Sequence, residues 1–160
     1  MLTIQERRSL IDRYREGHAE VVRALDGISA DELNTPESPG EWSPRQVVHH
    51  LADSEMMSAM RIRLLVAQDH ATIQGYDQEA FARTLYYDRP IERSMAAFGA
   101  ARAVTAEFLD RMSDEDWSSA GTHTESGPFS SEEWLQYYAN HAHDHADQIR
   151  RARAVYASNH

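Results

Sequence analysis

The sequence predicts an all-α domain built as a four-helix bundle. Three observations carry this prediction: four long segments have apolar residues at helical spacing, three of them begin with a helix-capping signature, and no segment alternates polar and apolar residues as a strand would. The chain has 160 residues, the usual size of one domain, so we expect a single domain over residues 1–160. Long connections between the helices permit crossovers, so helix order and direction stay open.

The first two helices have clear starts. The first is predicted over residues 4–26, because Thr3 and Glu6 are spaced as a capping box and Gly27 is a typical stop signal. The second is predicted over residues 44–67. Its start, "WSPRQ", offers a serine N-cap, a proline at the first helical position and a glutamine at the capping-box position.

The last two helices follow long connections. Residues 70–89 join the second helix to the third, and "YDQEAFARTL" within them is compatible with one short helix. The third helix is predicted over residues 90–112 from its apolar spacing. The fourth is predicted over residues 131–156, with Ser130 and Glu133 spaced as another capping box.

Composition excludes several classes of function. The chain has no cysteine, so disulfides, thiolate metal sites and thiol nucleophiles are all excluded. Acidic residues outnumber basic residues by 26 to 16, and a formal net charge of −10 disfavours a nucleic-acid partner. No apolar run approaches the roughly 20 residues of a membrane span. The N-terminus also lacks a signal-peptide core. We therefore expect a cytoplasmic protein with no membrane partner.

The fourth helix carries histidines on its apolar face. The stripe recurs at spacings of three and four residues: Trp134, Tyr138, His141, His145, Gln148, Ala152 and Val155. His141 and His145 are one turn apart on this face. His143 is about 200° from His141 at the usual rotation per residue, so it is predicted to point outward. Two histidines at this spacing can share a metal ion, although on this spacing alone two hydrogen-bonded core rings are the more common arrangement.

A third histidine favours the metal. In "VVHHLADSE" of the second helix, His50 lies beside the apolar stripe, while His49 is turned about 100° from it. Burying three titratable rings without a partner is costly, and a divalent ion removes that cost by using their lone pairs. Three histidine ligands with open positions are typical of catalytic sites. The sequence therefore predicts a metal site at His50, His141 and His145.

Two segments carry a resemblance to a known family. "EWSPRQVVHHLADSE" (41–55) and "GPFSSEEWLQYYANHAHDHADQI" (127–149), with "HTESGPFS" leading into the latter, resemble the DinB-like or YfiT-like metalloenzymes. The resemblance implies a four-helix bundle, commonly a homodimer, with His50, His141 and His145 holding zinc or nickel. Asp144 departs from the pattern, since many relatives have a histidine there, but this position should face away from the metal.

Three further residues are weaker candidates for the site. Asp53 follows His50 by one turn and could accept the outer N–H of a ligand histidine, or it could be a solvated helix charge. Gln148 could line the pocket or satisfy a buried polar neighbour. His123 could reach a pocket, because loops at bundle ends often carry such residues. It otherwise belongs with the histidines predicted at the surface or in loops, which are His18, His70 and His160.

The predicted metal site leaves three functions open. The first is a hydrolase that uses a metal-activated water on an unknown small-molecule substrate, with no general base evident on the helix faces. The second, which the wider family resemblance implies, is a thiol-dependent S-transferase or isomerase, with a metal-stabilised thiolate. The third is a non-catalytic bundle whose metal only stabilises the fold or reports metal availability. Assays with and without thiols separate the first two, and a closed coordination sphere would favour the third.

Overall fold

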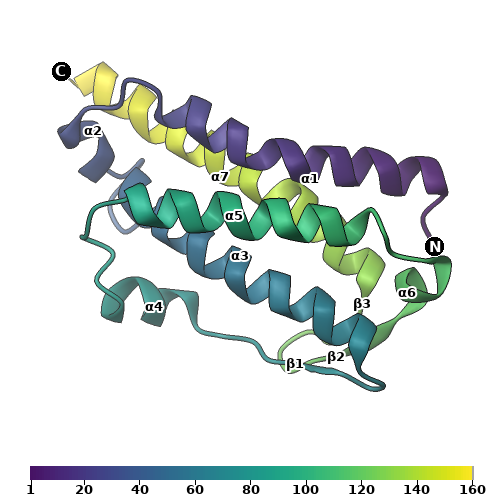
Figure 1. Ribbon diagram of the computed structural model, residues 1–160. Helices are drawn as coiled ribbons and strands as arrows, with labels where there is room; N and C mark the ends of the chain where they lie inside the picture. Colours follow the sequence, from purple (N-terminus) through teal and green to yellow (C-terminus); the bar gives the residue numbers. More distant parts are fainter. Residues whose placement is uncertain (160) are drawn as a thin grey trace.

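The computed structural model describes residues 1–159 and confirms the predicted helical bundle (Figure 1). The long helices are α1 (Ile4–Leu25), α3 (Pro44–Ala67), α5 (Glu92–Leu109) and α7 (Ser131–Asn159). Shorter helices lie in the connections: α2 (Ala30–Asn34), α4 (Gln78–Thr84) and α6 (Asp114–Ser118). His160, which was predicted at the surface, lies outside the described residues.

Local capping signals set the observed helix starts. The predicted capping boxes of α1 and α3 are both formed. At the start of α7, Ser130 and Glu133 exchange hydrogen bonds of 2.8 and 3.2 Å. The bounds of α3 match the predicted range of 44–67. The observed α5 is shorter than the predicted 90–112, because after Leu109 the backbone tightens into i to i−3 hydrogen bonds that end the α-helix.

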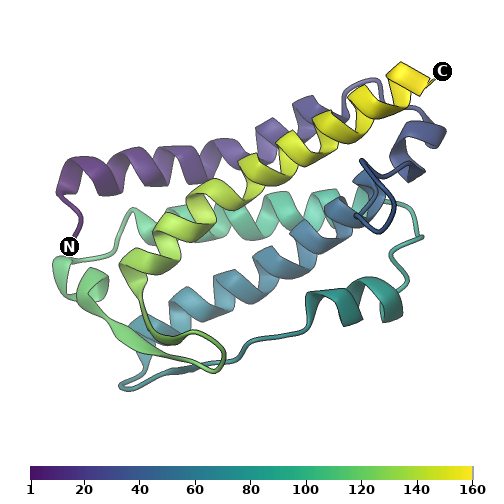
Figure 2. The same ribbon diagram turned by 180° about the vertical axis from the view of Figure 1, so that it is seen from behind.

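The long helices pack in an order that differs from their order in the chain. α1 packs against α5 and α7, and α3 packs against the same two helices, so α1 and α3 lie diagonally across the bundle. Figure 1 shows α1 and α7 running in one direction and α3 and α5 in the other, and the reverse view in Figure 2 agrees. Each of the pairs α1–α7 and α3–α5 is therefore parallel, which requires long crossing connections. This settles the helix order and direction that the sequence left open.

A small sheet lies at one end of the bundle (Figure 1), and Ile73 of this sheet is buried in the hydrophobic core. It consists of β1 (Thr72–Ile73), β2 (Ala120–His123) and β3 (Gly127–Ser130), in the order β1-β2-β3. β1 pairs in parallel with β2, and β2 pairs antiparallel with β3. Gly121 lets the first pair approach, because any Cβ there would clash with the backbone oxygen of Ala71. Strands this short leave no alternation to detect, which is why the sequence predicted none.

A buried ion pair crosses the helical core. Arg102 of α5 donates from Nη1 to Oε2 of Glu55 on α3 at 2.5 Å, and both side chains are 2% exposed or less. The Tyr14 hydroxyl of α1 donates to the other oxygen of Glu55. Arg102 also donates to the Tyr138 carbonyl of α7 at 2.9 Å. One polar cluster thus touches all four long helices within an otherwise apolar core. Among residues 1–159, no helix combines the length and apolarity needed to cross a membrane.

Candidate metal centre

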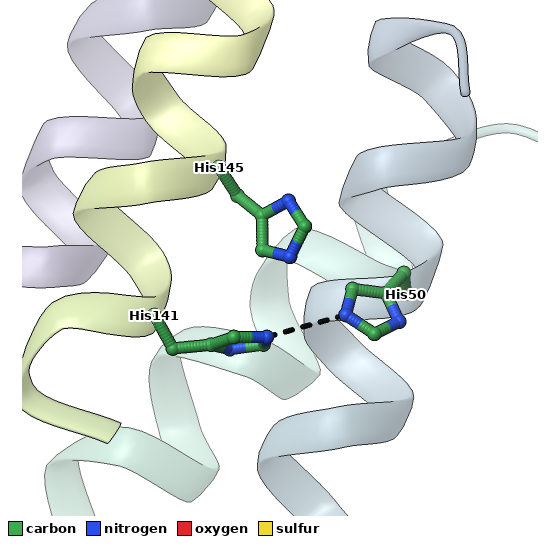
Figure 3. A group of neighbouring side chains, drawn as sticks. All are labelled: His50, His141 and His145. Carbon is green, nitrogen blue, oxygen red and sulfur yellow. Dashed lines mark hydrogen bonds between the residues drawn. The ribbon is translucent and has the colours of Figure 1, made fainter. Parts of the chain in front are cut away.

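Three histidine side chains converge between α3 and α7. His50 projects from α3, and His141 and His145 project from α7 toward it (Figure 3). One ring nitrogen of each lies within 4.8 Å of those of the other two. The rings meet edge-on, with centroids 4.6 to 5.3 Å apart. The structure therefore brings together the three residues that the sequence analysis predicted as metal ligands.

Helix geometry explains this convergence. His141 and His145 are one turn apart, so they share the face of α7 that packs against α3. His50 lies in the second turn of α3, whose start is set by the Ser43 cap. α3 and α7 run in opposite directions, and this second turn lies beside the middle of α7. Rigid helices rather than loops hold all three rings.

The spacing of the nitrogens fits a metal ion. The Nε2 atoms of His50 and His141 are 3.3 Å apart. Two nitrogens bound to one tetrahedral zinc ion at about 2.0–2.1 Å lie about 3.3–3.4 Å apart. The side chains of His50 and His141 are buried, and that of His145 is half-buried. The donor set is therefore compatible with a tetrahedral ion that keeps an open position.

Burial keeps the three rings neutral at physiological pH. It lowers the pKa of His50 to about 3, with a further contribution from nearby His145. The pKa of His141 is held well below its ordinary value, first by burial and then by its two histidine neighbours. Burial also lowers the pKa of His145. Neutral imidazoles have the lone pairs that a divalent cation needs.

Gln148 contacts one of the three histidines. The Nδ1 atom of His145 lies 2.8 Å from Oε1 of Gln148. An amide oxygen only accepts, so the ring proton must be on Nδ1, which leaves the lone pair on Nε2. A partner of this kind sets the tautomer and orientation of a ligand histidine. The structure supports both roles considered for Gln148: it contacts a polar neighbour that belongs to the candidate site, and it lines an opening beside that site.

Aromatic rings enclose the histidines. The ring of Trp42 lies 4.6 Å from that of His50 and is stacked 6.4 Å from that of His145. The ring of Tyr137 is stacked 5.5 Å from that of His141. Trp42, which precedes the serine cap of α3, therefore contacts two of the three clustered histidines. These rings reduce solvent access on two sides of the cluster.

The two remaining helix histidines stay out of the cluster. The ring of His49 is fully buried, with Nδ1 2.7 Å from the Ser94 hydroxyl and Nε2 3.0 Å from the Arg89 carbonyl, so both of its nitrogens are engaged. The outward orientation predicted for His143 is wrong. Its side chain is buried, and its Nε2 lies 2.9 Å from the Arg13 carbonyl. The reason is that α7 packs against α1 as well as α3, so two faces of α7 are covered.

Asp53 lies apart from the three histidines. Its side chain is half-buried, and its Oδ2 accepts a 2.6 Å hydrogen bond from the Tyr87 hydroxyl. Within residues 1–159, the structure gives Asp53 no hydrogen bond to the cluster. Asp53 therefore has a partner that neither sequence interpretation considered. A contact with Tyr87, 34 residues away, has no local signature in the sequence.

A cleft of about 720 Å³ opens onto His50 and His141. His123, at the end of β2, lines the same cleft. Its Nδ1 accepts a hydrogen bond of 3.2 Å from the backbone N–H of Glu125, so Nε2 is the nitrogen left for a bound molecule. His123 therefore lines a pocket, one of the two positions that its loop at the bundle end allowed.

The short helix α4 lies across the histidine site. A second opening of about 290 Å³ is lined by His145 and Gln148, and the first turn of α4 lines both openings. Glu79 in that turn accepts a hydrogen bond of 3.3 Å from the indole N–H of Trp42. Sequence reasoning missed this carboxylate, because only the fold brings α4 over the site. Its one sequence signal was the short helix compatible with "YDQEAFARTL".

The protein therefore belongs, by its fold and site, to the helical bundles with a candidate metal centre: three histidines face inward and an open cleft leads to two of them. Residues 13–149 match the family model of the DinB superfamily. The chain therefore belongs to the DinB superfamily, as its sequence resemblance predicted.

Curated relatives and a solved structure are similar over most of the chain. A protein of Oceanobacillus iheyensis, named as a candidate metal-dependent hydrolase, is 32% identical over 76% of this chain and 71% of its own length. A protein of Bacillus mycoides with the same description is 29% identical over 84% of this chain and 78% of its own length. The fold is similar to that of YfiT from Bacillus subtilis, described as a probable metal-dependent hydrolase with an unusual four-helix bundle topology. That match has a TM-score of 0.92 at 24% identity and covers 98% of this chain and 91% of YfiT.

Proposed function

We propose that this protein is a metal-dependent hydrolase acting on a small molecule in the cleft beside His50 and His141. The observation that carries the proposal is the convergence of three neutral imidazoles, two of which line that cleft. The names of the curated relatives support the reaction class. A divalent ion held by the three rings would supply a Lewis acid and lower the pKa of water toward neutrality.

We propose zinc or nickel as the ion. The group of side chains that can hold it consists of histidines alone. Imidazole nitrogen suits zinc and nickel better than it suits magnesium or calcium, which favour oxygen ligands. A chain without cysteine offers no thiolate to change that preference.

The surrounding side chains have distinct roles in this proposal. Gln148 holds the tautomer of His145, while Trp42 and Tyr137 limit the access of bulk water. Glu79 lines both openings beside the histidines, where its carboxylate can accept a proton from water in the cleft. The indole N–H of Trp42 orients that carboxylate. The larger opening admits the substrate.

The test is an activity screen tied to metal content. Protein loaded with zinc or nickel is assayed against small esters, amides and lactones, alongside His141→Ala and the cluster-external variant His49→Ala. We expect turnover in the loaded wild type and in His49→Ala, and none in His141→Ala. Turnover that requires an added low-molecular-weight thiol would instead indicate the transferase. Metal binding without turnover under either condition would indicate a non-catalytic bundle.

A further inference from the structure

Two arginines are buried in the described part of the chain, and they differ in whether a carboxylate balances their charge. Arg102 is 1% exposed and pairs with the carboxylate of Glu55. Arg61 is 9% exposed, yet among residues 1–159 no carboxylate forms an ion pair with it. A buried charge without a counter-ion is costly to the fold. Arg61 therefore carries a positive charge that the described protein leaves without a partner of opposite sign.

Neutral groups hold the Arg61 side chain in place. Its Nη1 donates to the Tyr138 hydroxyl at 3.0 Å, and its Nη2 donates to the Gln74 carbonyl at 2.7 Å. The guanidinium also lies 5.7 Å from the centre of the Tyr76 ring. Burial raises the pKa of Tyr138 to about 12, so its hydroxyl is a neutral phenol and not a counter-ion. A guanidinium has five N–H donors, and Nε is buried here without a partner.

Arg61 lines the same cleft as the histidine cluster. His50, His141 and Arg61 all contribute to its wall. Tyr138 connects the two parts, because its hydroxyl accepts from Arg61 and its ring centre is 5.7 Å from that of His141. One small molecule in the cleft can therefore contact the histidine cluster and the guanidinium together.

The carboxylates of this cleft lie at its exposed rim. Asp77, Glu79 and Glu125 are all exposed, in contrast to the buried Arg61. Asp77 caps the start of α4, and Glu79 accepts from Trp42. The cleft thus has acidic groups around its opening and one cation on its inner wall.

We propose that Arg61, positioned by Tyr138 and Gln74, binds a carboxylate group of the substrate. This proposal rests on the proposed function and deepens it: the substrate is a small carboxylic acid whose anionic group lies at Arg61 while its reactive group lies at the histidines. The bound carboxylate supplies the counter-charge that Arg61 lacks. Hydrogen bonds between arginine and a carboxylate are charge-assisted, so Arg61 should bind a carboxylate more tightly than a neutral polar group.

The first test compares three hydroxamates that bind zinc through the same group and differ in the charge of the group at the other end. Zinc-loaded protein is titrated with succinic monohydroxamate, its neutral primary amide, and β-alanine hydroxamate, whose tail is an ammonium. We expect the carboxylate to bind at least about tenfold more tightly than the amide, from the usual strength of charge-assisted hydrogen bonds. Arg61→Gln should reduce that ratio to about twofold or less. Equal binding of carboxylate and amide by the wild type, or tighter binding of the ammonium tail, would overturn the proposal.

The matched control is Arg63→Gln. Arg63 lies two residues along the same helix but donates to Thr105 of α5 at 3.2 Å, and it does not line the cleft. This variant loses the same charge and should keep the carboxylate preference. If Arg61→Gln fails to fold, the comparison of carboxylate and amide in the wild type still decides.

A second test separates the anion site from the metal site. Protein as purified is titrated with glutarate and with neutral glutaramide at matched ionic strength, without added metal. We expect glutarate to raise the melting temperature of the wild type and Arg63→Gln, and not that of Arg61→Gln. If zinc or acetohydroxamate fails to bind while glutarate retains this pattern, the proposed function falls and the role of Arg61 stands. If glutarate and glutaramide act alike on the wild type, the role of Arg61 falls.

Discussion

The Nε2 atoms of His50 and His141 lie 3.3 Å apart, although 91 residues separate the two histidines in the chain. Without metal, one ring can only donate a single weakly favourable hydrogen bond to the other. A shared divalent ion would replace that contact by two metal–nitrogen bonds. The packing of α3 against α7 thus holds two donor atoms at a spacing that one ion can bridge.

Replacement of any cluster histidine should abolish stoichiometric metal binding. We expect His50→Ala, His141→Ala and His145→Ala each to bind well below one equivalent of zinc or nickel, because two imidazoles cannot complete the site. Metal content after dialysis, measured by plasma mass spectrometry, checks this. Metal should also raise the melting temperature of the wild type and leave those three variants unchanged.

The neighbouring histidines provide the controls. His49→Ala and His143→Ala should each keep one equivalent of metal. Both should lose stability, by about 1–3 kcal/mol, because each removes a buried ring together with its hydrogen bonds to a neighbouring segment. Loss of metal in His143→Ala with retention in His141→Ala would mean that the wrong face of α7 has been assigned to the metal.

The helix starts could be predicted because capping is local. Ser43 and its proline and glutamine neighbours set the start of α3 within a few residues of sequence, and the structure agrees. The periodicity of α7 likewise places His141 and His145 on one face. The same reasoning fails for His143. Periodicity shows which residues share a face of a helix, but not how many of its faces are covered by neighbouring helices.

The remaining features depend on contacts between distant segments. The parallel pairing of α1 with α7, the contact of Asp53 with Tyr87 and the position of Glu79 over the site have no local signature. Helical spacing puts Arg61 on the same face of α3 as Val47 and Leu51, but the lack of a carboxylate partner for it among residues 1–159 has no local signature. The homodimer, the choice of zinc or nickel and the cytoplasmic location stay predictions.

Loss of the amide at Gln148 should weaken metal binding without removing it. Gln148→Ala leaves Nδ1 of His145 without its acceptor, so the ring loses its fixed tautomer and orientation. Partners of this type typically contribute about 10–100-fold to metal affinity. Competition with a chromogenic chelator measures the effect. Gln148→Glu keeps an acceptor and should retain affinity near that of the wild type; equal weakening in both variants would argue against this role.

Acid should destabilise the metal-free protein below about pH 6.5. Burial lowers the pKa of His50 to about 3 and also lowers the pKa values of His141 and His145, whereas histidine in an unfolded chain titrates near pH 6.5. At pH values between the folded-state and unfolded-state pKa values, the unfolded chain binds protons that the folded protein does not. The free energy of unfolding therefore falls as the pH falls. Each histidine contributes a slope of up to about 1.4 kcal/mol per pH unit.

Urea unfolding from about pH 7.5 down to about pH 5 measures this slope. His50→Gln removes one of the titrating groups and should make the slope shallower. His70→Gln, which changes an exposed histidine, should leave it unchanged. The same slope in His50→Gln and the wild type would show that proton uptake by this histidine does not control acid stability.

Breaking the buried ion pair should strongly destabilise the bundle. Glu55→Ala leaves the guanidinium of Arg102 in the core without its carboxylate, which typically costs about 3–5 kcal/mol. Chemical denaturation measures the loss. Asp147→Ala breaks the exposed pair with Arg150 and should cost less than about 1 kcal/mol. The double variant Glu55→Leu with Arg102→Met removes both charges and should be more stable than Glu55→Ala alone.

The parallel pairing of α1 with α7 has a consequence for biosynthesis. α1 leaves the ribosome early, with Tyr14 and Val21 on a face that α7 will bury, but that face stays uncovered until every residue between Leu25 and Ser131 has been added. The nascent chain must therefore carry an exposed apolar helix face through most of its translation. Chains in this state are prone to associate with one another or with chaperones. Two of the three clustered histidines also arrive with that last helix, so the site forms only when the bundle closes.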